Sequence, residues 1–187
     1  PHEFDFGIIP PGKHRLTVRV DNRMLMNYRP DAHAVSDSLG STWNGIVGKI
    51  ELRSTPPVWI EELQVYPDEQ LKSAKVRVLV RSIDMGENRD LLFVGASLYT
   101  DETSKTPFTH TNISWSGGAG MFEVKISLRG FWKTWDAFTP EMFETWAGLH
   151  FAKVEKTAIF GLRDFKTSGQ EFIINGRPTM LRGTHHG

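Results

Sequence analysis

Cysteine is absent from the 187 residues. The chain therefore has no disulfide, no thiolate nucleophile and no zinc site built on cysteine. No apolar run reaches the roughly 18–20 residues that cross a bilayer, and no signal-peptide pattern opens the sequence, so we expect no membrane partner. These absences leave the cellular compartment open.

An excess of charge of either sign is also missing. Lys plus Arg and Asp plus Glu both total 22, and the charges are scattered along the chain. Without a basic stripe that could follow phosphates, nucleic acid is not an expected partner. No amphipathic helix of useful length occurs either, and residues 139–146 could form at most one short helical turn.

The sequence does contain an apolar periodicity of two. Hydrophobic and polar residues alternate over 13–20, 75–81 and 122–128. Successive side chains of a strand point to opposite faces, so each segment has one apolar and one solvated face. Antiparallel sheets with one buried face give this pattern. Turn-forming residues separate the segments, at 10–12, 84–86 and 116–120.

Residues 58–66 break the alternation. Val58 and Ile60 lie on one face of the expected strand, but Leu63 and Val65 lie on the other. A β-bulge near Glu61-Glu62 would shift the register by one residue and restore one apolar face. Near the C-terminus, the Asn175-Gly176 pair separates two apolar segments and predicts a tight hairpin with a type I′ turn.

Prolines at 56–57 divide the chain, because they cannot donate ladder hydrogen bonds. About a hundred residues with six or seven short strands follow, which suits an immunoglobulin-like sandwich. Two or three strand candidates precede the prolines and are too few for a core of their own. The predicted fold class is all-β.

Three segments near the C-terminus form a linked set, which reads FGLRDF at 160–165, FIINGRP at 172–178 and LRGTHH at 181–186. The set resembles a junction in glycoside hydrolase family 2, the family of β-galactosidases, β-glucuronidases and β-mannosidases. There an FG-R strand closes an immunoglobulin-like domain, a hairpin with NG-P follows, and LRG opens the catalytic (β/α)8 barrel. Earlier segments resemble strands of the family's jelly-roll domain, namely GKHRLTVRVDN at 12–22, and WNGIVG at 43–48 with EL at 51–52.

The resemblance implies three parts. Residues 1–55 would be the end of the jelly-roll, sugar-binding domain, residues 56–165 an immunoglobulin-like sandwich, and residues 166–187 a hairpin leading into a missing barrel. The expected partners are the parent's own barrel and jelly-roll domains and, in the complete enzyme, an oligosaccharide. Unpaired strand edges in the first 55 residues also predict a homodimer. The parent could be a bacterial enzyme of the periplasm or cytoplasm.

The parent is expected to be a retaining β-glycosidase, which uses two carboxylates about 5 Å apart. The family's acid/base glutamate follows an asparagine on a later barrel strand, and this chain contains no Asn-Glu pair. Its only adjacent glutamates, Glu61 and Glu62, would point to opposite faces of a strand. We therefore expect no catalytic residue, no cofactor and no metal in this chain, and no hydrolysis by it alone.

Four residues have a claim on a binding site. By resemblance, His185 or His186 would line the sugar pocket of the complete enzyme, although in the isolated chain both would belong to a frayed terminus. The family usually continues with Asn-Arg-His, so Thr184-His185-His186 is a departure that leaves the sugar open. Trp132 and Trp135 could contact sugar or a neighbouring domain.

Two alternatives belong to other classes of function. A stand-alone carbohydrate-binding module predicts exposed, coplanar tryptophans, and six tryptophans are present. An immunoglobulin-like adhesion or assembly module predicts a large exposed apolar patch. The barrel-opening motif at 181–186 weighs against both.

Overall fold

The computed structural model describes residues 2–21, 45–68, 70, 72–130 and 133–184. The chain divides into two units, residues 53–183 and residues 1–52 with 184–187. The described residues form strands, turns and irregular segments, and the predicted all-β class is confirmed. Nowhere in these ranges is there a helix with the length and hydropathy that a membrane crossing requires.

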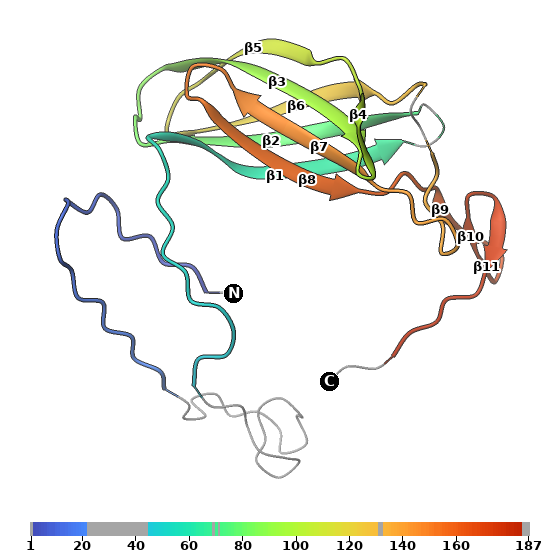
Figure 1. The fold of residues 1–187 in the computed structure, drawn as a ribbon, viewed down its shortest axis with the longest axis horizontal. Coiled ribbons are helices and arrows are strands. Elements are labelled where there is room, and N and C mark those ends of the chain that lie inside the picture. Colours follow the sequence, from blue (N-terminus) through green and yellow to red (C-terminus); the bar gives the residue numbers. More distant parts are fainter. Residues whose placement is uncertain (1, 22–44, 69, 71, 131–132, 185–187) are drawn as a thin grey trace. The chain divides into compact units, whose positions relative to one another are not determined.

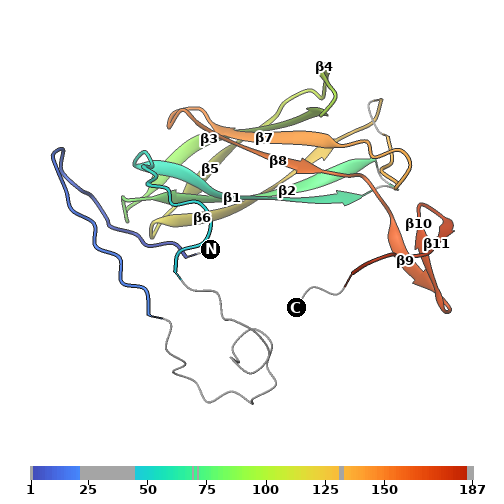
Figure 2. The ribbon, with the colours of Figure 1, turned by 60° about the horizontal axis from the view of Figure 1, so that its bottom comes forward.

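The unit of residues 53–183 contains a sandwich of two antiparallel sheets (Figures 1 and 2). The three-stranded sheet has the order β1 (Val58–Asp68), β2 (Ser73–Ser82) and β6 (Ala119–Ser127). In the five-stranded sheet, the central strand is β3 (Asn88–Leu98). On one side it pairs with β7 (Phe143–Leu149), which pairs with β8 (Val154–Phe160). On its other side, β3 pairs with two strands. Residues 88–94 pair with β5 (Thr109–Trp115), and residues 97–98 pair with β4 (Asp101–Lys105).

A third, small sheet follows the sandwich in the chain. Its strands are β9 (Phe165–Ser168), β10 (Glu171–Ile174) and β11 (Arg177–Thr179), with β10 in the middle. The turn between β10 and β11 is Asn175-Gly176, with φ angles of 51° and 77°. Both values are positive, as a type I′ turn requires, so the predicted hairpin is confirmed.

The core lies between the two larger sheets. Alternate residues of β2 and β3 face it and are completely buried, namely Val76, Val78, Val80, Leu92, Val94 and Ala96. The predicted bulge in β1 is also confirmed, because the register with β2 shifts between Ile60 and Glu62. The shift brings Ile60, Leu63 and Val65 to the same core.

The strand β7 was missed by the sequence reading. Residues 143–146 belong to this strand rather than to a short helical turn, so that expectation was wrong. The inward residues are Phe143, Thr145, Ala147 and Leu149, all buried. Thr145 and Ala147 are weakly hydrophobic, so the alternation is faint in the sequence although β7 is paired on both sides, with β3 and β8.

The unit that includes residues 1–52 contains no strand in its described ranges, 2–21 and 45–52. The strand predicted for 13–20 was therefore wrong, and no strand covers residues 45–48 of the predicted closing strand. Leu16 and Val18 are 61% and 58% exposed. A strand is stable only when a partner takes up its backbone hydrogen bonds and a surface covers its apolar face. Residues 2–21 and 45–52 contain no strand that could act as such a partner. The domain boundaries predicted at residues 55 and 165 stay predictions.

A buried donor near the end of β5 gives a first prediction. The Trp115 indole is 7% exposed, yet its Nε1 donates to no described residue. The ring packs edge-on against Phe122, with centroids 6.2 Å apart. We expect Trp115→Phe to change the free energy of unfolding by less than about 1 kcal/mol, because lost contacts are offset by removal of an unsatisfied donor.

Trp115→Ala is the matched control, since it removes the donor and the packing together. It is expected to cost about 3–5 kcal/mol. Urea unfolding followed by circular dichroism measures both variants. Equal losses in the two would contradict the role assigned to the indole N–H.

Candidate functional site

The predicted site residues fall in two groups. His185, His186 and Trp132 lie outside the described residues. Trp135 is half-buried in the connection between β6 and β7. Over the described residues, no group of three or more His, Asp or Glu side chains is placed to hold a metal ion.

Asn175 joins the small sheet to the sandwich. Its side-chain Nδ2 donates to the Trp135 carbonyl oxygen at 2.9 Å, and its Oδ1 accepts from the Asp164 amide at 3.0 Å. Its own amide donates to the Asp164 carbonyl oxygen at 2.9 Å. One turn residue thus binds two segments that lie 40 and 11 positions away in the chain.

Trp135 is held at the same place from the side of β8. Its amide donates to the Leu162 carbonyl oxygen at 2.8 Å. A Cβ added at Gly161 would lie 3.1 Å from the Trp135 Cβ and Cγ, so a side chain there would crowd the indole. The Arg163 guanidinium lies 5.0 Å from the centre of the Trp135 ring, within the range of a cation–π interaction. We call Trp135, Gly161, Arg163, Asp164 and Asn175 the junction cluster.

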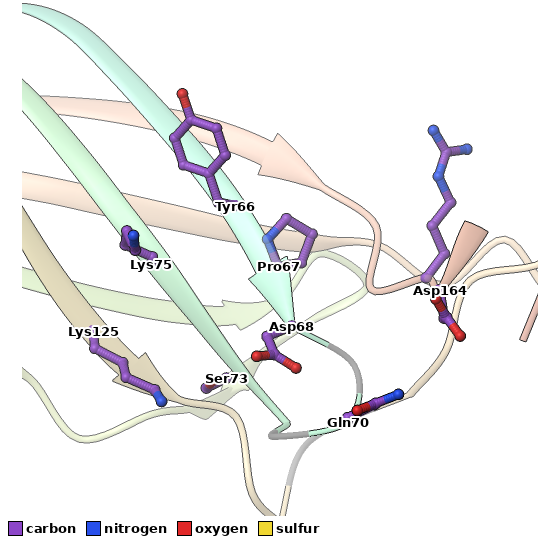
Figure 3. A pocket seen from close by; sticks show the side chains of 9 residues that line it. Tyr66, Pro67, Asp68, Gln70, Ser73, Lys75, Lys125 and Asp164 are labelled. Carbon is purple, nitrogen blue, oxygen red and sulfur yellow. The ribbon is translucent and has the colours of Figure 1, made fainter. Parts of the chain in front are cut away.

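A partly open pocket lies at the adjoining end of the three-stranded sheet (Figure 3). Its cavity volume is about 430 Å³. Lys75 of β2, Lys125 of β6 and Arg163 of the β8–β9 connection line it with positive charge. Asp68 and Asp164 contribute carboxylates. The pocket is therefore a polar site with charges of both signs.

Ion pairs continue from the pocket along the outer face of the same sheet. Glu123 accepts from Arg77 Nη2 at 2.8 Å, and its other oxygen lies 3.6 Å from Lys75 Nζ. The hydrogen bond from Arg77 is the main reason that the pKa of Glu123 lies below its ordinary value. The same bond raises the pKa of Arg77. Glu123 is therefore ionised and forms ion pairs with Arg77 and Lys75.

Glu61 and Glu62 are both engaged locally. Glu61 Oε2 accepts from Trp59 Nε1 at 2.6 Å, and the backbone oxygen of Glu61, at the bulge, accepts from Lys156 Nζ at 2.5 Å. Glu62 Oε2 accepts from Gln64 Nε2 at 3.0 Å. These contacts fit the predicted role of the pair at a bulge rather than in catalysis.

Sequence reasoning missed an aromatic cluster on the outer face of the five-stranded sheet. The Phe108 ring packs edge-on against Phe93 and Trp146, with centroid distances of 6.0 and 5.5 Å. A Cβ at Gly148 would lie 2.2 Å from the Phe93 ring, and one at Gly95 would lie 2.7 Å from the Trp146 ring. The two rings therefore lie across glycines on the neighbouring strand. Glycine inside each strand was the available signal.

Comparisons with known proteins identify solved structures of similar fold. No protein-family model and no curated protein matches the sequence. Solved structures do match. A family 2 β-galacturonidase from Eisenbergiella tayi, bound to galacturonate, has a TM-score of 0.55 at 18% identity over 65% of this chain and 21% of its own.

Two further structures agree with the first. A glycosyl hydrolase family 2 member from Bacteroides cellulosilyticus has a TM-score of 0.54 at 14% identity, over 67% of this chain and 17% of its own. A β-glucuronidase from Parabacteroides merdae has a TM-score of 0.51 at 18% identity, over 70% and 17%. The chain thus spans about a fifth of these proteins. Its resemblance to glycoside hydrolase family 2 is confirmed at the level of the fold.

Proposed function

We propose that this chain is the non-catalytic β-sandwich region of a family 2 glycoside hydrolase and that it positions neighbouring domains of that enzyme. The observation that carries the proposal is the junction cluster. The FG-R segment at 160–163 was singled out by resemblance, and the NG turn at 175–176 by its turn type and by resemblance. Both meet Trp135 through hydrogen bonds and close packing. This convergence of both motifs on Trp135 supports the proposal that the small sheet is firmly attached to the sandwich.

A rigid attachment suits a spacer. The small sheet precedes residues 181–186, which resemble the opening of the barrel. If the sheet is fixed to the sandwich, the sandwich sets the direction in which the following residues leave. The barrel and the jelly-roll domain are the proposed partners, and an oligosaccharide is the proposed substrate of the complete enzyme.

The enzymatic part of the proposal is tested by nitrophenol release. The 187-residue chain and a version extended through the following several hundred codons of its gene are assayed side by side. The panel contains β-galactoside, β-glucuronide, β-galacturonide, β-mannoside and β-glucoside substrates. We expect no turnover by the short chain, because it lacks the family's paired barrel glutamates, and turnover of one β-glycoside by the long chain.

Hydrolysis by the short chain would overturn the proposal and would direct attention to Asp68 and Asp164, the two carboxylates of the pocket. Failure of a folded long chain on every substrate would overturn the assignment of the parent. Circular dichroism and a cooperative melting transition establish that each protein is folded before the assay.

The alternative of a carbohydrate-binding module receives less support. The Trp135 ring is covered by Arg163 and packed on Gly161. In the outer-face cluster, Phe108 is inclined by 82° to Phe93 and by 75° to Trp146. The ring contacts of Phe108 are therefore edge-on rather than coplanar. The alternative of an immunoglobulin-like adhesion module does not explain why the FG-R segment and the NG turn both meet Trp135.

The predicted homodimer rested on unpaired strands in the first 55 residues. No strand is present in residues 2–21 and 45–52, so that particular basis is not found in these ranges. Pairing of two copies through a strand edge stays a proposal. Size-exclusion chromatography with light scattering at rising concentration tests it, and a constant monomer mass would contradict it.

A further inference from the structure

The turn between β10 and β11 contains a chemically reactive dipeptide, Asn175-Gly176. Asparagine is among the thermolabile residues, and the glycine after it has no side chain to shield its backbone nitrogen. Gly176 is exposed, whereas Asn175 is half-buried. A Cβ added at Gly176 would meet no atom within 4 Å, so the space beside this residue is open. The Gly176 nitrogen is therefore accessible for attack on the Asn175 side chain.

The reaction is spontaneous deamidation, a covalent modification whose only co-reactant is water. The Gly176 backbone nitrogen forms a bond to Asn175 Cγ, and the Cγ–Nδ2 bond breaks. Nδ2 leaves as ammonia with its own two protons and the Gly176 amide proton, so a cyclic imide remains. Water then opens the imide at either carbonyl carbon, giving its hydroxyl to that carbon and its other proton to the nitrogen. The products are aspartate and isoaspartate, and no atom is oxidised or reduced.

The junction cluster holds the carboxamide of Asn175 against this reaction. Nδ2 donates to the Trp135 carbonyl oxygen at 2.9 Å, and Oδ1 accepts from the Asp164 amide at 3.0 Å. For ring closure, Cγ must turn onto the Gly176 nitrogen and become tetrahedral, which takes the planar carboxamide off both partners. Loss of two such hydrogen bonds corresponds to a factor of roughly thirty. The reaction should therefore proceed from the opened junction.

The products do not restore the junction. Aspartate lacks the Nδ2 donor and turns a carboxylate oxygen toward the Trp135 carbonyl oxygen, which is also an acceptor. Isoaspartate sends the main chain through Cβ and Cγ, and the longer turn no longer fits the two positive φ angles of residues 175–176. We propose that Asn175 is a deamidation site protected by the closed junction, and that its modification makes detachment of the small sheet permanent.

The inference rests on the contacts of the junction cluster and not on the proposed function, so its test involves no glycosidase assay. Peptide mapping by mass spectrometry follows the 187-residue chain at mildly alkaline pH. Tryptic peptide 167–182 contains Asn175 as its single asparagine, and deamidation replaces an amino group by a hydroxyl group. We expect the folded chain to react roughly thirtyfold more slowly than the same chain unfolded in guanidinium chloride, because the rate follows the open fraction of the junction.

Variants connect the rate to the junction. Gly161→Ala places a methyl group 3.1 Å from Trp135 Cβ and Cγ, and we expect it to speed the reaction of the folded chain about tenfold. Arg163→Gln removes the guanidinium from the Trp135 ring, with an expected increase of about threefold. Gly183→Ala is the matched control, because a Cβ there meets no atom within 4 Å, and it should react at the wild-type rate. Cooperative melting checks that each variant is folded.

The state of the product is measured separately. Ion-exchange chromatography isolates the deamidated chain, which carries one additional negative charge. Hydrogen exchange of the amides in β9–β11 should be at least about tenfold faster in this fraction than in the unmodified chain.

Three results would overturn the inference. Equal rates in the folded and unfolded chains would mean that the bonds to Trp135 and Asp164 do not restrain Asn175. A faster reaction in the folded chain would mean that the Asp164 amide activates the side-chain carbonyl as an oxyanion donor. Wild-type exchange in the deamidated fraction would mean that the modification leaves the small sheet attached.

Discussion

Replacing Asp90 by alanine is expected to lower the free energy of unfolding by about 3 kcal/mol. Asp90 lies in β3 and is 5% exposed. Its Oδ1 accepts from the amides of Leu91 and Phe151 at 2.7 and 2.9 Å, and its Oδ2 accepts from the amide of Ala152 at 3.0 Å. Alanine would leave three partly buried N–H groups without this acceptor. Charge-assisted hydrogen bonds are the strong ones, which is why the loss is large.

The loss of stability should be concentrated in the turn between β7 and β8. Residues 151 and 152 form the turn between β7 and β8, and Asp90 fastens this turn to the adjacent strand of the same sheet. Asp90→Asn keeps one acceptor oxygen but turns an amide donor toward backbone donors. The free energy of unfolding of Asp90→Asn should therefore lie between those of wild type and Asp90→Ala.

The control for this prediction is Asp84→Ala. Asp84 is exposed and its Oδ1 accepts from one amide, that of Gly86, at 2.8 Å. Its loss should cost less than about 1 kcal/mol. Urea unfolding by tryptophan fluorescence gives the three free energies, with unchanged m-values as the sign that the unfolded state is unaltered. An Asp90→Ala variant as stable as Asp84→Ala would contradict the fastening role.

Asp90 also shows where a sequence is informative about a buried polar group. It has the same parity in β3 as Leu92, Val94 and Ala96, all of which are buried. A carboxylate in phase with core residues signals a buried acceptor with several donors. The donors could not be named from the sequence, because they belong to a turn about 60 positions away.

Local patterns gave the most reliable predictions. The bulge at Glu61 and the Asn175-Gly176 turn depend on a few neighbouring residues, and both are confirmed. The strand predicted at 13–20 has an equally clear alternation but forms no strand. Alternation shows that a segment can have an apolar face, whereas a strand also needs a partner. The partner comes from elsewhere in the chain, so the local alternation does not reveal whether one is present.

The same distinction applies to the candidate sites. Asn175 was marked by its turn type and by resemblance, while its bonds to Trp135 and Asp164 depend on the fold. Lys75 and Lys125, which both line the pocket, likewise lie opposite each other only through the register between β2 and β6, and β3, β4 and β5 separate these strands in the chain. Lys75 and Lys125 are each ordinary solvated residues in the sequence. Only pairing makes them a charged site.

Replacing Asn175 by alanine is expected to release the small sheet from the sandwich without unfolding the core. Two side-chain hydrogen bonds are lost, at about 1 kcal/mol each. Alanine at a φ of 51° adds a further cost of about 1 kcal/mol, because a Cβ is disfavoured in the left-handed region. A local loss of about 3 kcal/mol corresponds to roughly hundredfold faster hydrogen exchange of the amides in β9–β11.

Native-state hydrogen exchange on the 187-residue chain resolves this effect from global unfolding. Amides of β2 and β6, which belong to the sandwich rather than to the small sheet, should exchange at wild-type rates in the variant. Asn175→Gly accepts the backbone angle but removes both side-chain bonds, so its effect should be smaller than that of alanine. Asn175→Asp keeps the acceptor for the Asp164 amide but turns a carboxylate oxygen toward the Trp135 carbonyl oxygen, so its effect should exceed that of glycine.

The order of the variants carries the argument. If strain and both hydrogen bonds hold the junction, exchange in β9–β11 should rise from wild type through glycine to alanine, with aspartate above glycine. Equal exchange in glycine and alanine variants would remove backbone strain from the account. Wild-type exchange in all three would mean that Trp135 and Asp164 do not hold the small sheet, and the proposed spacer would lose the contact on which its rigidity depends.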